Sequence, residues 1–376
     1  MDWIINILYY IVPFVVLLGI LVFVHEFGHF LIARLCGVQV TDFSIGFGRQ
    51  LWGFTDKHKT NWKICAIPLG GYCQFLGDAD AASANSDESI KELSEEDKKR
   101  AFPFQNPWKK LAIVLGGPGF NYLFAIIVFM FMFALLGKLT FPPIVGEVIE
   151  GGAASKAGIM QNDRILEING KQIEDFSDIS TEIALSVDNQ ATVKLKRGED
   201  ILNLTIVLEK MEVEANGQTT KRPMLGIKSL TTMETNHQKM SWGEAFTEAC
   251  AETWRITEGT LRGVGQMITG KRGSEDLGGI IRIAEMSGDI SKESGLIDFI
   301  AFMALLSINL GLINLFPIPV LDGGHVVIYL IEIATRREIN TKVKENLFRV
   351  GFALIIALMI FATWNDVVHL FNRFFA

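Results

Sequence analysis

Four long segments with almost no charged residues dominate the pattern of hydrophobic and polar positions along the chain. We assign them to residues 1–37, 108–137, 298–335 and 346–372. A helix crosses the apolar core of a bilayer with ~20 residues, so segments of this length can span it. The sequence therefore predicts an α-helical polytopic membrane protein with about four transmembrane helices.

The segments between these spans have different patterns. Residues 38–77 alternate apolar and polar positions and contain several glycines, which predicts a membrane-associated β-hairpin region. Residues 78–107 are polar and predict a cytoplasmic loop, whereas short strand patterns and an Asn-Gly turn in 144–212 predict an inserted α/β domain. Within the linker 213–297, the amphipathic stretch 241–267 is expected either to lie along the membrane surface or to pack on this domain.

Basic residues predict the orientation of the spans. Short loops with an excess of lysine and arginine stay in the cytoplasm, and such residues follow the first and the third span. The N-terminus, the segment 138–297 and the C-terminus are then expected on the outer side, which is consistent with four spans. The basic residues that carry this prediction are Arg49, Lys57, Lys59, Lys63, Lys98, Lys99, Arg100, Lys109, Lys110, Arg336, Arg337, Lys342 and Lys344.

The composition agrees with a membrane protein and narrows the functional classes. Of the 376 residues, 49% are hydrophobic and only 20% are charged, which is too apolar for an ordinary soluble protein. A net charge of -7 gives no sign of nucleic-acid binding. The four cysteines, Cys36, Cys65, Cys73 and Cys250, form no close CxxC pair and are interpreted as free thiols.

The most specific chemical motif is His-Glu-Phe-Gly-His at residues 25–29, near the inner end of the first span. On a helix, this spacing puts His25 and His29 one turn apart on the same face, where both can bind one zinc ion while Glu26 acts as a general base. The pentad alone also occurs by chance. Within an apolar span, however, each charged group costs about 2–3 kcal/mol, so ionisable residues there usually have a function. We therefore predict a Zn²⁺ site.

A catalytic zinc ion needs a third protein ligand, and Asp322 is the candidate. It follows Pro317 and Pro319, which must break the helix of the third span. Irregular backbone at membrane depth is tolerated only where protein or a cavity covers it. The first and third spans are predicted to cross in the same direction, with His25 and Asp322 both in the cytoplasmic half. Asp322 could instead cap a half-helix, but the matched depth favours metal binding.

Together, these motifs resemble the site-2 protease family of intramembrane metalloproteases, and within it the bacterial regulator of sigma-E protease (RseP) group. The resemblance covers nearly the whole chain. It rests on the pentad at 25–29, Gly-Phe-Gly at 46–48, Gly-Gly-Pro-Gly-Phe-Asn at 116–121 and the stretch 314–323. The domain at 144–212 resembles a PDZ module.

The resemblance implies a role for each group of residues. His25, His29 and Asp322 would bind Zn²⁺, and Glu26 would activate a water molecule. The irregular part of the third span would hold an extended substrate, and the hairpin would offer that substrate an edge strand. The implied substrate-binding positions are Asn314, Pro317, Pro319, Gly46, Phe47 and Gly48.

The same resemblance implies a setting and partners. The protein is expected in the bacterial inner membrane, surrounded by lipid, with the PDZ domain in the periplasm and the active site near the cytoplasmic face. Its substrates would be transmembrane proteins such as anti-sigma factors or remnant signal peptides, cut after an upstream site-1-type protease and filtered by the PDZ domain. The chain departs from the group in having room for one PDZ module rather than two. It also has Ile280 where relatives usually have proline.

Two other functions are compatible with a metal site in a membrane. A PDZ scaffold with a structural metal would be expected to provide four protein ligands, whereas the sequence offers three and a general base. A zinc transporter would be expected to line a path with further intramembrane carboxylates or histidines. The second and fourth spans lack charges at their centres. Proteolysis that is lost on chelation separates the protease from the scaffold.

Overall fold

The computed structural model describes residues 2–78, 93–186, 189–215, 218–230, 236–270 and 278–375. Parts of four predicted regions lie outside the described residues: residue 1 of the first span, 79–92 of the polar loop, 187–188 of the α/β domain, and several linker residues that include Leu277. The chain forms two compact units. The first contains residues 1–129, 249–257 and 277–376, and the second contains residues 130–248 and 258–276.

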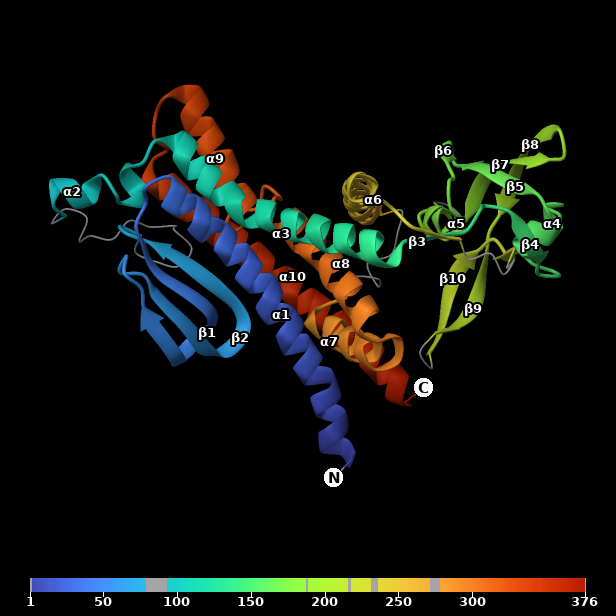
Figure 1. Ribbon diagram of the computed structural model, residues 1–376, viewed down its shortest axis with the longest axis horizontal. Coiled ribbons are helices and arrows are strands. Elements are labelled where there is room, and N and C mark those ends of the chain that lie inside the picture. Colours follow the sequence, from blue (N-terminus) through green and yellow to red (C-terminus); the bar gives the residue numbers. More distant parts are fainter. Residues whose placement is uncertain are drawn as a thin grey trace. The chain divides into compact units, whose positions relative to one another are not determined.

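Long apolar helices build the first unit (Figure 1). Among the described residues, α1, α3, α8 and α10 each contain a stretch long and apolar enough to cross a membrane, which confirms the prediction of about four spans. The shorter α9 follows α8. The bounds are α1 Asp2–Leu35, α3 Pro107–Leu136, α8 Leu296–Asn314, α9 Asp322–Thr335 and α10 Thr341–Phe375.

An irregular segment divides the predicted third span into two helices. α8 ends at Asn314 and α9 begins at Asp322. Pro317 and Pro319 between them have no N–H group to continue the helical hydrogen bonds. Val320 has a φ of 91°, a conformation that strains a β-branched residue and persists only where the surrounding structure holds it. The break is therefore a defined feature of the fold, and it sets where α9 begins.

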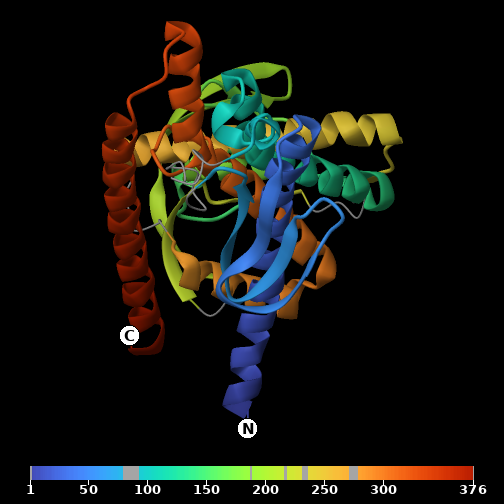
Figure 2. The same cartoon turned by 90° about the vertical axis from the view of Figure 1, so that its left-hand side faces the viewer.

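The predicted β region forms a hairpin of two long, bent strands. Phe43 pairs with both Cys73 and Trp62, so the start of the first strand lies between the two ends of the second. Two views show the hairpin alongside α1 (Figures 1 and 2). The rings of Phe43 and of Phe30 in α1 pack edge to face at 5.7 Å, which joins the hairpin to the helix. The strand bounds are β1 Val40–Thr55 and β2 Asn61–Phe75.

Glycines allow α1 and α3 to cross at close range. A Cβ atom at Gly116 would lie 2.7 Å from the carbonyl oxygen of Gly28, and a Cβ atom at Gly28 would also clash with the backbone of Gly116. Small residues at helix crossings are typical of membrane proteins, because close backbone packing replaces the hydrophobic effect there. The crossing brings α3 against the part of α1 that carries the histidine pentad.

The second unit contains the predicted α/β domain, and its PDZ assignment stays a prediction. A four-stranded antiparallel sheet has the order β6-β5-β7-β8. Its core includes Ile165, Ile168, Val193 and Leu195, which are all fully buried. The bounds are β4 Val145–Val148, α4 Ala153–Lys156, β5 Arg164–Ile168, β6 Lys171–Gln172, α5 Phe176–Ala184, β7 Gln190–Arg197, β8 Asp200–Val207 and β11 Ile227–Ser229.

The remaining elements are short, except for the amphipathic helix α6. β4 pairs with β11, β3 with β12, and β9 with β10. The bounds are α2 Glu95–Lys98, η2 Phe102–Phe104, β3 Lys138–Thr140, β9 Glu209–Ala215, β10 Gln218–Met224, β12 Asn236–Gln238, α6 Trp242–Ile268, α7 Ile280–Asp289 and the π-helix η4 Ile290–Ser294.

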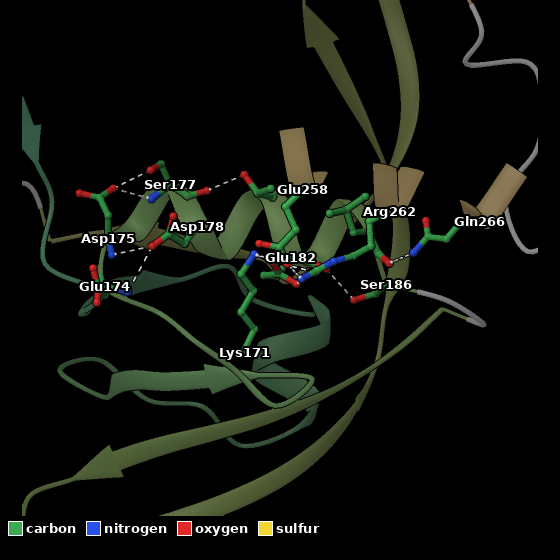
Figure 3. Close-up of polar contacts among 12 residues, drawn as sticks. Lys171, Glu174, Asp175, Ser177, Asp178, Glu182, Ser186, Glu258, Arg262 and Gln266 are labelled. Carbon is green, nitrogen blue, oxygen red and sulfur yellow. Dashed lines mark hydrogen bonds and ion pairs between the residues drawn. The ribbon is translucent and has the colours of Figure 1, made fainter. Parts of the chain in front are cut away.

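Polar contacts join α6 and β6 to α5 (Figure 3). The Glu182 side chain is only 4% exposed, and its Oε2 lies 2.8 Å from Nη1 of Arg262. Lys171 Nζ lies 3.1 Å from Oε1 of the same carboxylate. Gln266 Nε2 donates to the backbone carbonyl oxygen of Leu185. Packing on the α/β domain is one of the two placements expected for this helix, and the structure shows it.

Candidate metal centre

The two histidines of the pentad point their Nε2 atoms at one place. His25 and His29 lie one turn apart on α1, and both side chains are buried. Their Nε2 atoms are 3.2 Å apart, and their rings meet edge to face. Imidazoles at this spacing on one helical face can bind one metal ion together.

Asp322 completes this group from a distant part of the chain. Its Oδ2 lies 3.2 Å from Nε2 of His25, and its Oδ1 lies 3.5 Å from Nε2 of His29. One potential ligand atom from each residue lies within 4.8 Å of the others. Oδ2 is buried and has no hydrogen-bond partner among the described residues, as expected of an oxygen reserved for a cation. Two nitrogens and one oxygen fit zinc and leave a fourth position for water.

The proline break determines where this carboxylate lies. Asp322 is the first residue of α9, so the irregular segment before it and the two glycines after it control its position. A Cβ atom at Gly324 would lie 2.5 Å from the carbonyl oxygen of Ile318, and a Cβ atom at Gly323 would clash with the backbone of Phe316. The absence of side chains there lets the first turn of α9 fold back against the break.

α3 contacts both histidines. Nδ1 of His29 lies 2.9 Å from the backbone carbonyl oxygen of Ile113, and Nδ1 of His25 lies 3.0 Å from Nδ2 of Asn121. Gly117 lies between these two contacts in the sequence. A Cβ atom at Gly117 would be 2.8 Å from Cε1 of His25 and would clash with Nε2 of His29. α3 therefore packs closely against both imidazoles.

Comparisons with known proteins identify the protein family. The family model described as peptidase family M50 matches residues 13–358. This chain belongs to peptidase family M50. A protein of Agrobacterium fabrum that is provisionally named a zinc metalloprotease is 40% identical over 95% of both chains. A provisionally named zinc metalloprotease of Rhizobium meliloti is 38% identical over 98% of both chains. Metalloprotease MmpA of Caulobacter vibrioides is 32% identical over 95% of both chains.

The names of these relatives agree with the metal-binding atoms found in the site. The family and the names of its members indicate a zinc metalloprotease, which confirms Zn²⁺ as the predicted cofactor. The roles of the individual residues stay predictions.

Within the M50 fold, Glu26 lies beside the hairpin. Its side chain is half-buried. A Cβ atom at Gly71 of β2 would lie 3.2 Å from Cγ of Glu26 and 2.7 Å from a methyl group of Val22. Gly71 therefore lets β2 approach the predicted general base closely. In sequence, the only sign of this contact is a Gly-Gly pair inside a strand pattern.

The predicted substrate-binding residues occupy two separate elements. Asn314 is the last residue of α8, and Pro317 and Pro319 lie in the irregular segment that leads to Asp322. Gly46, Phe47 and Gly48 lie in β1. A Cβ atom at Gly46 would lie 2.7 Å from the carbonyl oxygen of Ile67, so this glycine permits close pairing with β2. The Phe47 side chain is 41% exposed. The 116–121 motif supports the family resemblance, but its sequence suggests no role, so Gly117 and Asn121 were not predicted as residues of the site.

Proposed function

We propose that this M50 protein is an intramembrane protease that cleaves peptide bonds within transmembrane segments of other membrane proteins. The convergence of His25, His29 and Asp322 among helices that include four long and apolar enough to cross a membrane carries the proposal. Ionisable groups at that depth are costly unless they serve a function. A zinc protease with its ligands in such helices must meet its substrate in the membrane.

The chain's own residues divide the chemistry between them. His25, His29 and Asp322 would hold the zinc ion, which when bound lowers the pKa of a coordinated water molecule and polarises the substrate carbonyl. Glu26 neighbours His25 in the sequence but does not belong to the group of three ligands. It accepts the proton from the attacking water and delivers it to the leaving amide nitrogen.

A transmembrane substrate must unwind locally, because the amides of a helix are shielded by its own hydrogen bonds. An extended segment needs new partners for its backbone groups, and pairing with a strand edge provides them. The hairpin is suited to this role. One end of β2, at Gly71, lies against Glu26. We infer that this hairpin and the break around Pro317 and Pro319 hold the substrate next to the metal.

The second unit would select substrates before cleavage. We propose that the domain 144–212 is a PDZ module on the periplasmic side of a bacterial inner membrane, with the metal centre near the cytoplasmic face. It would admit proteins whose external part has been trimmed by an upstream protease, such as anti-sigma factors or remnant signal peptides. Deleting residues 144–210 should then allow untrimmed proteins to be cut, and unchanged selectivity would contradict the filter.

Membrane proteomics of the native host tests the main proposal. Wild-type protein is compared with Glu26→Gln at equal expression, and bound zinc is measured in both purified proteins. We expect Glu26→Gln to keep its zinc while short single-span stubs accumulate, because the general base is lost and the ligands remain. An unchanged fragment pattern with zinc bound would reject proteolysis and favour a PDZ scaffold with a structural metal.

A further inference from the structure

We propose that Asn121 orients His25 for zinc binding by accepting a hydrogen bond from its Nδ1–H through the side-chain amide oxygen. This inference rests on the proposed metal centre and adds a residue to it. Asn121 lies on α3 and is fully buried. The described residues leave only two buried side-chain atoms without a hydrogen-bond partner, Oδ1 of Asn121 and Oδ2 of Asp322. Both belong to this centre.

The direction of the His25 ring determines which nitrogen binds metal. Its Nε2 faces the carboxylate of Asp322 and Nε2 of His29, whereas its Nδ1 faces Asn121 at 3.0 Å. A neutral imidazole that binds a cation through Nε2 must carry its proton on Nδ1. That N–H is buried and needs an acceptor.

The amide of Asn121 can supply this acceptor after a half-turn about its Cβ–Cγ bond. In the structure, its Nδ2 faces the ring and its Oδ1 has no partner. The two ends of an amide have nearly the same shape, and their assignment depends on the hydrogen-bond network. A donor facing Nδ1 would force the ring proton onto Nε2, where it blocks metal binding. The orientation with Oδ1 toward His25 is the one compatible with zinc.

His29 shows the same arrangement with an acceptor that cannot turn. Its Nδ1 lies 2.9 Å from the backbone carbonyl oxygen of Ile113, which only accepts hydrogen bonds. Nδ1 of His29 therefore carries the proton, and its Nε2 is free for the metal. α3 thus provides one acceptor for each histidine, a carbonyl for His29 and the Asn121 amide for His25. Partners of this kind fix the tautomer and orientation of metal-binding histidines.

Separate contacts hold the Asn121 backbone, so the role of its side chain can be tested alone. Ser307 Oγ of α8 donates to the backbone carbonyl oxygen of Asn121 at 3.0 Å, and Ser307 is fully buried. Removing this hydroxyl perturbs the packing between α3 and α8 next to Asn121 but leaves the side-chain amide in place. Ser307→Ala is therefore a matched control for an effect of packing.

The test measures zinc affinity in the purified full-length protein without substrate. Wild type, Asn121→Asp, Asn121→Leu and Ser307→Ala are titrated with zinc against a chromophoric chelator in detergent. An aspartate side chain has the size of asparagine but its carboxylate only accepts hydrogen bonds. A leucine side chain has a similar size and neither donates nor accepts hydrogen bonds. We expect Asn121→Leu to bind zinc about 10- to 100-fold more weakly. Asn121→Asp and Ser307→Ala should bind at least as tightly as wild type.

Rescue by aspartate separates an acceptor from a structural residue. Equal weakening in Asn121→Asp and Asn121→Leu, or wild-type affinity in Asn121→Leu, would overturn the proposal. Thermal unfolding of the metal-free proteins shows whether each variant is folded. If wild type binds zinc with no difference among folded variants, only this inference fails. If wild type binds no zinc and Glu26→Gln changes no fragments, the proposed function fails.

Discussion

Gly117 is expected to be a position where one added methyl group strongly weakens metal binding without removing a ligand. A Cβ atom there would lie 2.8 Å from Cε1 of His25, where ordinary contact begins near 3.4 Å, so α3 or the ring must move by about 0.6 Å (3.4 minus 2.8). Zinc sites accept ligand displacements of about 0.2 Å. We therefore expect Gly117→Ala to weaken zinc binding at least about 100-fold, or about 2.7 kcal/mol.

The assay for this prediction has a control on the same helix. A Cβ atom at Gly119 meets nothing within 4 Å, so Gly119→Ala adds the same methyl group without a clash. Both variants are titrated with zinc against a chelator, and their unfolding is followed without metal. Gly119→Ala should bind zinc like wild type. If folded Gly117→Ala also binds zinc like wild type, α3 does not press against the histidines, and the reasoning is wrong.

Three further predictions follow from individual contacts. Asp322→Ala should sharply lower zinc occupancy, measured by metal analysis after dialysis, and full occupancy would reject it as the third ligand. Burial raises the pKa of Asp163, but the Arg197 guanidinium and a backbone N–H lower it more, so its pKa lies below its ordinary value of 3.8. This contact stabilises the second unit fully above about pH 5, and the stabilisation is lost as the pH falls below 3.8. Arg197→Met should therefore flatten the pH dependence of unfolding there, as measured by calorimetry, whereas an unchanged slope would contradict the assignment. The buried Asp366 carboxylate accepts three N–H groups at the start of α7, at 2.8 to 3.3 Å. Asp366→Ala should cost about 0.5–2 kcal/mol and speed amide hydrogen exchange in α7, with Asp366→Asn intermediate; equal protection in all three proteins would show that the cap is unimportant.

The pentad could be interpreted from sequence because its information is local. The spacing of His25 and His29 matches one helical turn, so the helix alone puts them on one face. Asp322 could also be predicted as a candidate ligand. Two prolines in an apolar span indicate irregular backbone, which is tolerated in a membrane only where protein or a cavity covers it. Asn121 could not be assigned in this way. Its role depends on the close crossing of α1 and α3. A pair of glycines permits this crossing, but the crossing cannot be predicted from the glycines alone.

For the hairpin as well, the sequence predicted the secondary structure but not the residue that contacts the site. Its alternating pattern predicted β structure, and the resemblance drew attention to Gly46, Phe47 and Gly48. The residue that packs against Glu26 is instead Gly71, which pairs with Ile45 on the neighbouring strand, next to that motif. Alternation indicates which residues share a face, but the register and bending of the two strands determine which residue reaches the helix.

By itself, the sequence determined the apolar helices, the two histidines on one helical face, and the proline break that precedes a carboxylate. These depend on hydropathy, helical period and the chemistry of proline, which are properties of neighbouring residues. Only the tertiary structure decided that the Asp322 oxygens meet both Nε2 atoms and that α3 faces both Nδ1 atoms. Such contacts require positions within a few tenths of an ångström, and the packing of several helices together sets them.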